Sequence, residues 1–432
     1  MNWIAAFTIE LPVAGPLVGL FVLGLCVGGL VNLGIYRLAW HARSISPWST
    51  PPADGPPRRW SDRLPIFGWL GLRREAAIHG RGFWFRPMLV ELLSGVGFAA
   101  LYWWEIDRLG LLLPGVPRPS AAVLHATCAA HLVLVSLMLV ASLIDCDEKI
   151  IPDGITVSGT LVALLAAAIC PWSLLPDMFR RVNLGMLGNL LGPPPAPPAY
   201  DFLRLTSPNP WPNWLAGFPR AWPLLIGLAC WWLWCLALTY RTWYARHGWL
   251  RALELMCARL RREASTWRIL RMGLIGSAVV AVVWFVCGDY WAGLLSSLVG
   301  MAASGGIVWA IRIIGSAVLR REAMGFGDVT LMAMIGAFLG WQPCLIIFFL
   351  APFAGLVMGL ESLILRRGPE IPYGPFLCMA ALAVICGWAA VWEWSSPIFG
   401  LGGWLVLVLL ICLILMVPLL VLIRLVRALF GG

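Results

Sequence analysis

Charged residues are scarce in this chain. They make up 12% of its 432 residues, whereas hydrophobic residues make up 60%. A soluble globular domain carries about 25% charged residues, so the composition excludes an ordinary soluble protein. Internal repeats and coiled-coil heptads are also absent from the sequence, which leaves no signal for a repeat array or a fibre.

Paired cysteine motifs are missing as well. The twelve cysteines stand singly, most of them inside apolar stretches, and no C-x-x-C sequence occurs. The five histidines are scattered and lack the spacing of metal ligands. We therefore predict no metal site, and we expect the cysteines to act as small buried hydrophobes rather than as a disulfide framework.

Long apolar runs dominate the chain instead. A membrane-spanning helix takes roughly 20 residues, and we predict an all-α polytopic membrane protein with about 9–11 transmembrane helices. The first run shows no convincing cleavage site, so it is predicted to be a membrane helix rather than a removed signal peptide. The candidate spans are residues 13–36, 87–104, 121–144, 154–175, 221–240, 269–287, 290–314, 328–341, 343–365, 375–393 and 402–425.

Arginine clusters predict which loops face the cytoplasm. The segments 37–86 and 241–271 are both rich in arginine, and the positive-inside rule places both on the cytoplasmic side. An even number of candidate spans separates them, as this placement requires. The net charge of +10 therefore suits topology and anionic lipid rather than nucleic acid. Residues 251–271 are predicted to form a basic amphipathic helix on the inner leaflet, with partner docking as the weaker alternative.

Two acidic motifs fall on this same predicted face. "LIDCDEKIIPD" (143–153) joins the third and fourth spans, and "GFGD" (325–328) opens the eighth. Two carboxylates held together at a low-dielectric boundary share a proton, because both cannot ionise cheaply. The ionised group can take a proton from water while the protonated one donates to a peptide carbonyl, which is amide hydrolysis without a covalent intermediate. Gly325 and Gly327 would allow close approach of an extended substrate and unusual φ values.

The acidic residues alone leave other interpretations open. Asp328 at a helix start can cap the helix or complement its dipole. Asp145, Asp147, Glu148 and Asp153 can form a solvated turn between two helices. Carboxylates in a membrane can also line the ion path of a transporter.

Five segments, in order, resemble motifs of the type IV prepilin peptidases, which are GxGD intramembrane aspartic proteases. In this resemblance Asp145, seven residues before Pro152, is selected over Asp147 as the first catalytic aspartate, and Asp328 is the second. The segments are "GGLVNLGIYRL" (28–38), "RPMLVELLSG" (86–95), "LIDCDEKIIPD" (143–153), "GFGDVTLMAMIGAFLG" (325–340) and "IPYGPFL" (371–377).

The resemblance implies a multi-pass enzyme of the bacterial inner membrane. It would cleave the leader peptide of type IV prepilins or pseudopilins at the cytoplasmic face, with Asp145 and Asp328 as the catalytic pair and no cofactor for proteolysis. Many such enzymes also N-methylate the new N-terminus with S-adenosylmethionine. The alternatives are another GxGD protease with a different substrate and a non-enzymatic, ion-coupled transporter.

Three departures from the family pattern bear on these expectations. The segment 37–86 contains no cysteine, so the zinc-binding pairs of many relatives are absent and retention of methylation is left open. Thr330 stands where a lysine is frequent. Residues 176–270 look inserted relative to the compact core of the family. We predict that they contain a Pro-rich extracytoplasmic loop, an extra helix and a basic stretch. The remaining predicted divisions are 1–86 (first helix and basic loop), 87–175 (core with the first Asp motif) and 271–432 (core with GxGD).

Several further polar residues carry separate predictions. Glu91, inside the second span, should face protein or water, either supporting the site or acting as a structural acid. Asn32 is expected to bond another helix rather than substrate. Asp153 is expected to cap the fourth helix, and Glu322 to be a solvated rim charge. Pro372 and its neighbours should shape a kinked or re-entrant helix entry.

Overall fold

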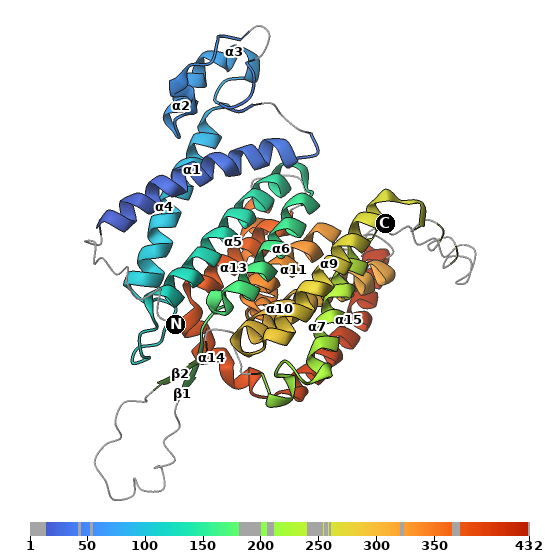
Figure 1. The fold of residues 1–432 in the computed structure, drawn as a ribbon. Coiled ribbons are helices and arrows are strands. Elements are labelled where there is room, and N and C mark those ends of the chain that lie inside the picture. Colours follow the sequence, from blue (N-terminus) through green and yellow to red (C-terminus); the bar gives the residue numbers. More distant parts are fainter. Residues whose placement is uncertain are drawn as a thin grey trace, which may run out of the picture.

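The chain is almost entirely helical where its structure is described (Figure 1). The computed structural model describes residues 14–41, 45–51, 55–180, 200–204, 211–239, 254, 258, 261–319, 324–364 and 372–430. Its main elements are α1 (Ala14–Leu38), α2 (Phe67–Leu72), α3 (Ala76–His79), α4 (Phe85–Tyr102), α5 (Ala121–Glu148), α6 (Asp153–Ile169), β1 (Asp177–Arg180), β2 (Tyr200–Arg204), α7 (Ala221–Ala237), α9 (Ala264–Val286), α10 (Gly288–Leu319), α11 (Phe326–Leu339), α12 (Trp341–Ile364), α13 (Gly374–Cys386), α14 (Trp388–Phe399) and α15 (Gly403–Phe430).

The helices agree with a multi-pass membrane protein. Within the described residues, six are long and apolar enough to cross a membrane: α1, α4 with the π-helical turn that follows it, α5, α9, α10 and α15. The pair α13 and α14 raises this number to seven if it counts as one span. Four shorter apolar helices are α6, α7, α11 and the part of α12 from Trp341 to Leu356. Each predicted span thus has a helix, and the all-α polytopic fold is confirmed.

The predicted span over 375–393 is divided between two helices, α13 and α14. The chain bends by 95° between α13 and α14, at Gly387. The indole N–H groups of Trp388 and Trp392 donate hydrogen bonds to the carbonyl oxygens of Pro176 (2.8 Å) and Met178 (3.1 Å). These bonds hold α14 across the end of the bundle, beside the start of β1.

Helix α11 lies inside the bundle (Figure 1). Every residue from Asp328 to Leu339 is buried, as expected for a helix that is apolar on all sides. It packs against α5, α6, α10, α12 and α13. Gly300 of α10 and Gly336 of α11 let the two backbones touch, because a Cβ on Gly300 would lie 2.1 Å from the Gly336 oxygen. Asp328 therefore stands at the mouth of a centrally packed helix.

The ends of the molecule differ in structure. Figure 1 shows α2 and α3 standing out beyond α1 and α4, with β1 and β2 at the opposite end. The two strands form an antiparallel hairpin in which Met178 pairs with Phe202. The predicted Pro-rich loop thus contains a short hairpin, although most of its Pro-rich part lies outside the described residues.

The predicted basic helix over 251–271 is only partly described. Residues 264–271 belong to the first turns of α9 rather than to a separate surface helix. Most of residues 251–260, together with Glu322, lie outside the described residues.

Candidate active site

Asp145 lies in the last turn of α5. The helix ends at Glu148, Lys149 follows in the left-handed conformation, and α6 begins at Asp153. The Asp145 side chain is buried, with 5% of the residue exposed. Its Oδ2 accepts a 3.1 Å hydrogen bond from the backbone N–H of Gly374, at the start of α13. The first acidic motif is therefore tied directly to the last of the five motifs.

Asp328 lies in the first turn of α11 and is equally buried, at 7% exposed. Gly325 occupies the N-cap position, and its backbone N–H interacts with the Asp328 carboxylate. A carboxylate in a first turn is also favoured by the helix dipole. A carboxylate in the first turn of α11 can stabilise the helix and also belong to an active site. The two interpretations of Asp328 are thus compatible.

The fold brings the two aspartates together. Helices α5, α11 and α13 pack against one another, and the carboxylates of Asp145 and Asp328 lie near enough to repel each other electrostatically. Cys378 of α13 interacts electrostatically with both carboxylates, and Tyr373 interacts electrostatically with Asp328. Sequence reasoning did not single out Tyr373 or Cys378 for the site, although Tyr373 belongs to the quoted segment 371–377.

Two glycines allow this assembly to close around Ile151. A Cβ on Gly327 would lie 2.8 Å from the Ile151 Cβ, and a Cβ on Gly374 would lie 2.6 Å from Oδ2 of Asp145 and 2.8 Å from the Ile151 Cδ1. The predicted unusual φ values are wrong: Gly325 has a φ of −65°, and Gly327 is absent from the positive-φ glycines. Gly327 does allow a close approach, to Ile151 in the turn after Asp145, whereas approach of a substrate stays a prediction.

The other acids of the first motif have structural partners. Arg86 donates to both oxygens of Asp147, at 2.8 and 2.7 Å. Glu148 accepts the backbone N–H groups of Trp40 (2.6 Å) and His41 (3.0 Å). Both contacts connect the end of α5 to the arginine-rich segment 37–86. They also distinguish Asp147, which is bound to a cation, from Asp145.

Asp153 does not cap α6 in the expected way. It is the first helical residue and is exposed, while Pro152 occupies the N-cap position without a side-chain hydrogen bond. Proline fits there because its own backbone is extended (φ −68°, ψ 133°), as an N-cap position requires, and a helix start needs no backbone N–H from it. The predicted capping by Asp153 is wrong, and Pro152 sets the start of α6.

Glu91 and Asn32 form a different cluster. The Glu91 carboxylate, 3% exposed, accepts hydrogen bonds from Ile66 N–H (2.5 Å), Trp69 Nε1 (2.7 Å) and Asn32 Nδ2 (3.4 Å). Asn32 also donates to the Pro87 carbonyl at 2.8 Å, so its predicted helix-to-helix bond is confirmed. Glu91 faces protein as predicted, and its bonds join α1, α4 and the arginine-rich segment rather than reaching either aspartate.

Ion pairs hold the segment that contains no cysteine. Arg74 pairs with the buried Asp62, and Arg58 pairs with the buried Glu75. Burial alone would raise the pKa of Asp62, but hydrogen bonds from Arg74 and the Arg59 N–H lower it below its usual value. In the described part of the chain, no cluster of three or more His, Cys, Asp or Glu residues could hold a metal ion. Sequence reasoning did not identify these pairs, since arginines are frequent throughout the segment.

Comparison with known proteins gives two family matches in chain order. The Bacterial Peptidase A24 N-terminal domain matches residues 22–105, and the Type IV leader peptidase family matches residues 266–360. The first includes Asn32 and Glu91 and the second includes Asp328. Asp145 lies between the two matched regions, so the fold supplies its link to Asp328. No solved structure shows significant similarity to the chain.

Several curated relatives carry one name, prepilin leader peptidase/N-methyltransferase. The Myxococcus xanthus protein is 35% identical over 173 residues, 40% of this chain and 45% of the relative. The Pseudomonas aeruginosa protein is 32% identical over 149 residues, 31% of this chain and 49% of the relative. The Stutzerimonas stutzeri protein is 28% identical over 202 residues, which are 42% of this chain and 62% of the relative. The matches thus span roughly half the length of these relatives. Together with the two ordered family matches, they show that this multi-pass membrane protein is similar to the type IV leader peptidase family over the matched regions.

Proposed function

We propose that the chain is a membrane-embedded aspartic endopeptidase that cleaves the leader peptide of type IV prepilins or pseudopilins. The observation that carries this proposal is the meeting of Asp145 and Asp328, two buried carboxylates from separate motifs. Both stand at helix ends, where water can approach from one side and an apolar substrate helix from the other. The names of the relatives, prepilin leader peptidase/N-methyltransferase, support the choice of substrate.

The carboxylate pair accounts for the chemistry. Because two adjacent charges repel in a low-dielectric site, the pair holds one proton. The ionised group removes a proton from water, which attacks the peptide carbonyl carbon while the protonated group donates to the carbonyl oxygen. Transfer of a proton to the leaving amine nitrogen then releases the leader. The Gly374 N–H keeps the Asp145 carboxylate oriented during these steps.

We place the site on the cytoplasmic side of a bacterial inner membrane. The arginine-rich segment is cytoplasmic by the positive-inside rule. Its residues contact the end of α5 through the bonds from Arg86 to Asp147 and from His41 to Glu148. The Asp145 end of the helix therefore lies at the face that carries the arginines.

The test is prepilin cleavage in membranes by wild type and three asparagine variants. Asp145→Asn and Asp328→Asn should each lower the cleavage rate at least about 100-fold, because each removes a general acid or base. Asp147→Asn is the matched control, in the same helix turn as Asp145 but exposed, and should cleave at close to the wild-type rate. Equal cleavage by wild type and both active-site variants, at equal expression, would show that the aspartic mechanism is wrong.

The same assay separates the alternatives. A GxGD protease with another substrate would cleave unrelated single-span helices as well as, or better than, prepilins. An ion-coupled transporter would cleave neither, even in the wild-type form. Preference for a prepilin with an intact leader over the same helix without one supports the proposal.

N-methylation is a second candidate function, and one cavity favours it. This cavity of about 300 Å³ lies between α1, α4 and the arginine-rich segment and is lined by Tyr36, Trp48, Trp69, Glu91 and others. Aromatic rings suit an adenine ring and a sulfonium cation, and a carboxylate suits ribose hydroxyls or the cation. The residues therefore fit S-adenosylmethionine, which supplies a methyl group when bound. Trp69 and Ile66 would hold the Glu91 carboxylate in place.

Methylation is tested independently of cleavage. The mass of the new N-terminus would be measured with and without S-adenosylmethionine, and binding of the cofactor by titration calorimetry. Trp48→Ala should weaken binding while the cleavage rate stays unchanged. Complete cleavage to an unmethylated product, without detectable cofactor binding, would refute this second function and leave the peptidase standing.

A further inference from the structure

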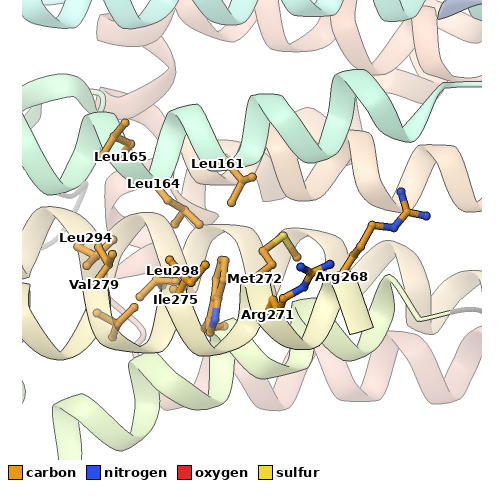
Figure 2. Close-up of a pocket in the computed structure, with 13 residues that line it drawn as sticks. Leu161, Leu164, Leu165, Arg268, Arg271, Met272, Ile275, Val279, Leu294 and Leu298 are labelled. Atoms are coloured by element: carbon orange, nitrogen blue, oxygen red, sulfur yellow. The ribbon is translucent and has the colours of Figure 1, made fainter. Parts of the chain in front are cut away.

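An elongated apolar groove lies on the far side of α6 from the arginine-rich segment. It encloses about 600 Å³ between α6 and α9, with further residues from α7 and α10. Figure 2 shows leucines of α6 along one wall and the side chains of α9 along the other. Apart from two arginines, every side chain that lines it is apolar. The lining includes Leu161, Leu165, Trp231, Ile275, Val279 and Leu298.

The two arginines stand together at one end of the groove (Figure 2). Arg268 and Arg271 are three residues apart in the first turns of α9, so they share one helix face. Both are exposed. Neither forms an ion pair with a carboxylate among the described residues. Glu263 precedes the same helix but lies outside the groove lining. Within the described residues, this end therefore presents two cations that no carboxylate neutralises.

The length of the groove matches one leaflet of a bilayer. Its lining on α9 runs from Arg268 to Val280, which corresponds to about 18 Å of helix. Half of a typical hydrocarbon core is about 15 Å. The arginine end lies at the same end of the bundle as the start of α6 and the aspartate pair, because α6 and α9 both begin there. An occupant would thus have a charged end at the membrane surface and an apolar body within the leaflet.

We propose that this groove binds an anionic phospholipid, with its phosphate at Arg268 and Arg271 and an acyl chain along the apolar wall. Guanidinium groups pair with phosphate oxygens through two parallel hydrogen bonds. A basic leader peptide would be repelled by the same two arginines, and so would a second copy of this chain docking through this face. The lipid site is separate from the aspartate pair and does not depend on proteolysis.

The test is lipid retention by the detergent-purified full-length chain, measured by native mass spectrometry. The probes are phosphatidylglycerol and phosphatidylcholine with identical acyl chains. Wild type should retain phosphatidylglycerol on the order of 10-fold more than phosphatidylcholine. The double variant Arg268→Gln/Arg271→Gln should lose this preference. The matched control Arg261→Gln/Arg262→Gln changes two exposed arginines outside the groove and should keep it.

A second variant tests the apolar wall. Ile275→Trp leaves both arginines in place and fills the groove, so it should lower retention of phosphatidylglycerol several-fold. Thermal unfolding of each variant checks that the fold is intact. Equal retention of both lipids by wild type, or equal losses in the groove and control double variants, would overturn the proposal.

Discussion

The backbone N–H of Gly374 donates a 3.1 Å hydrogen bond to Oδ2 of Asp145. The two residues belong to the last and the third of the five sequence motifs, and nothing in their spacing along the chain indicates the contact. It fixes the orientation of one carboxylate of the candidate pair. It also requires glycine, because any Cβ at position 374 would stand 2.6 Å from the same oxygen.

Replacing Gly374 with alanine should impair cleavage more than folding. The added methyl group must displace the Asp145 carboxylate, and misplacement of a reacting group by about 1 Å can cost 100-fold in rate. We expect Gly374→Ala to lower the cleavage rate at least about 10-fold. The measurement is the rate of prepilin cleavage in membranes at matched expression.

The control for this variant is Gly306→Ala in α10, where an added Cβ would meet no atom within 4 Å. Its rate should equal that of wild type. If Gly374→Ala cleaves as fast as the control, the contact with Asp145 has no role in orienting the catalytic group.

Glu91→Gln should loosen the arginine-rich segment. Glutamine keeps one acceptor oxygen, but its amide NH2 would oppose the Ile66 N–H or the Trp69 indole N–H. Leaving such a buried donor without an acceptor costs about 1–3 kcal/mol. Faster limited proteolysis within residues 55–84 would report this loss. Ser94→Ala, which removes a bond inside the same helix, should leave the proteolysis rate nearly unchanged.

The Asp62–Arg74 pair should stabilise the same segment in a pH-dependent way. Because the folded state lowers the pKa of Asp62, its contribution is complete above the unfolded pKa of about 3.9 and is lost as the pH falls through the lower folded value. Asp62→Asn should therefore cost about 3 kcal/mol at neutral pH. Unfolding measured from pH 7 down to pH 3 should show the wild-type advantage shrinking below about pH 4.

A pH-independent difference between wild type and Asp62→Asn would contradict this account. Asp107→Asn, at an exposed position, is the matched control. It should change stability little across the same range.

Asp177 should lower the stability of the folded state as the pH rises, which is the opposite of the effect of Asp62. Burial raises the pKa of Asp177 to about 7, and the nearby Met178 N–H offsets this rise only in part, because neither carboxylate oxygen has a hydrogen-bond partner among the described residues. Between the unfolded pKa of about 3.9 and this value, only the unfolded state ionises, so stability falls as the pH rises. Asp177→Asn removes that loss. The variant should unfold like wild type at pH 4 but be more stable at pH 8, by on the order of 2–4 kcal/mol. Equal unfolding temperatures at pH 8 would argue against the effect.

Particular residues show how far sequence reasoning reaches. The sequence alone points to Asp145 and Asp328, because acids among apolar residues are rare and because both belong to recognisable motifs. Asn32 is correctly expected to bond another helix, since a polar group in a membrane helix seeks a partner. The predicted capping role of Asp153 is wrong because proline can occupy the position before the helix. The bend at Gly387 within the predicted span 375–393 could not be foreseen, because the tryptophans of α14 bond to Pro176 and Met178, far away in the sequence.

The sequence by itself determined the class of protein, the positions of its helices and the residues able to carry chemistry. These properties follow from local composition. Apolar runs determine the helices, and arginines determine the predicted side of the membrane for each loop. Isolated carboxylates mark the positions where burial of a charge costs free energy. Only the tertiary structure decided which groups meet. The contacts of Gly374 with Asp145, of Arg86 with Asp147 and of Glu91 with Trp69 each join separate elements. They exist because buried polar groups must find partners wherever packing brings one within reach.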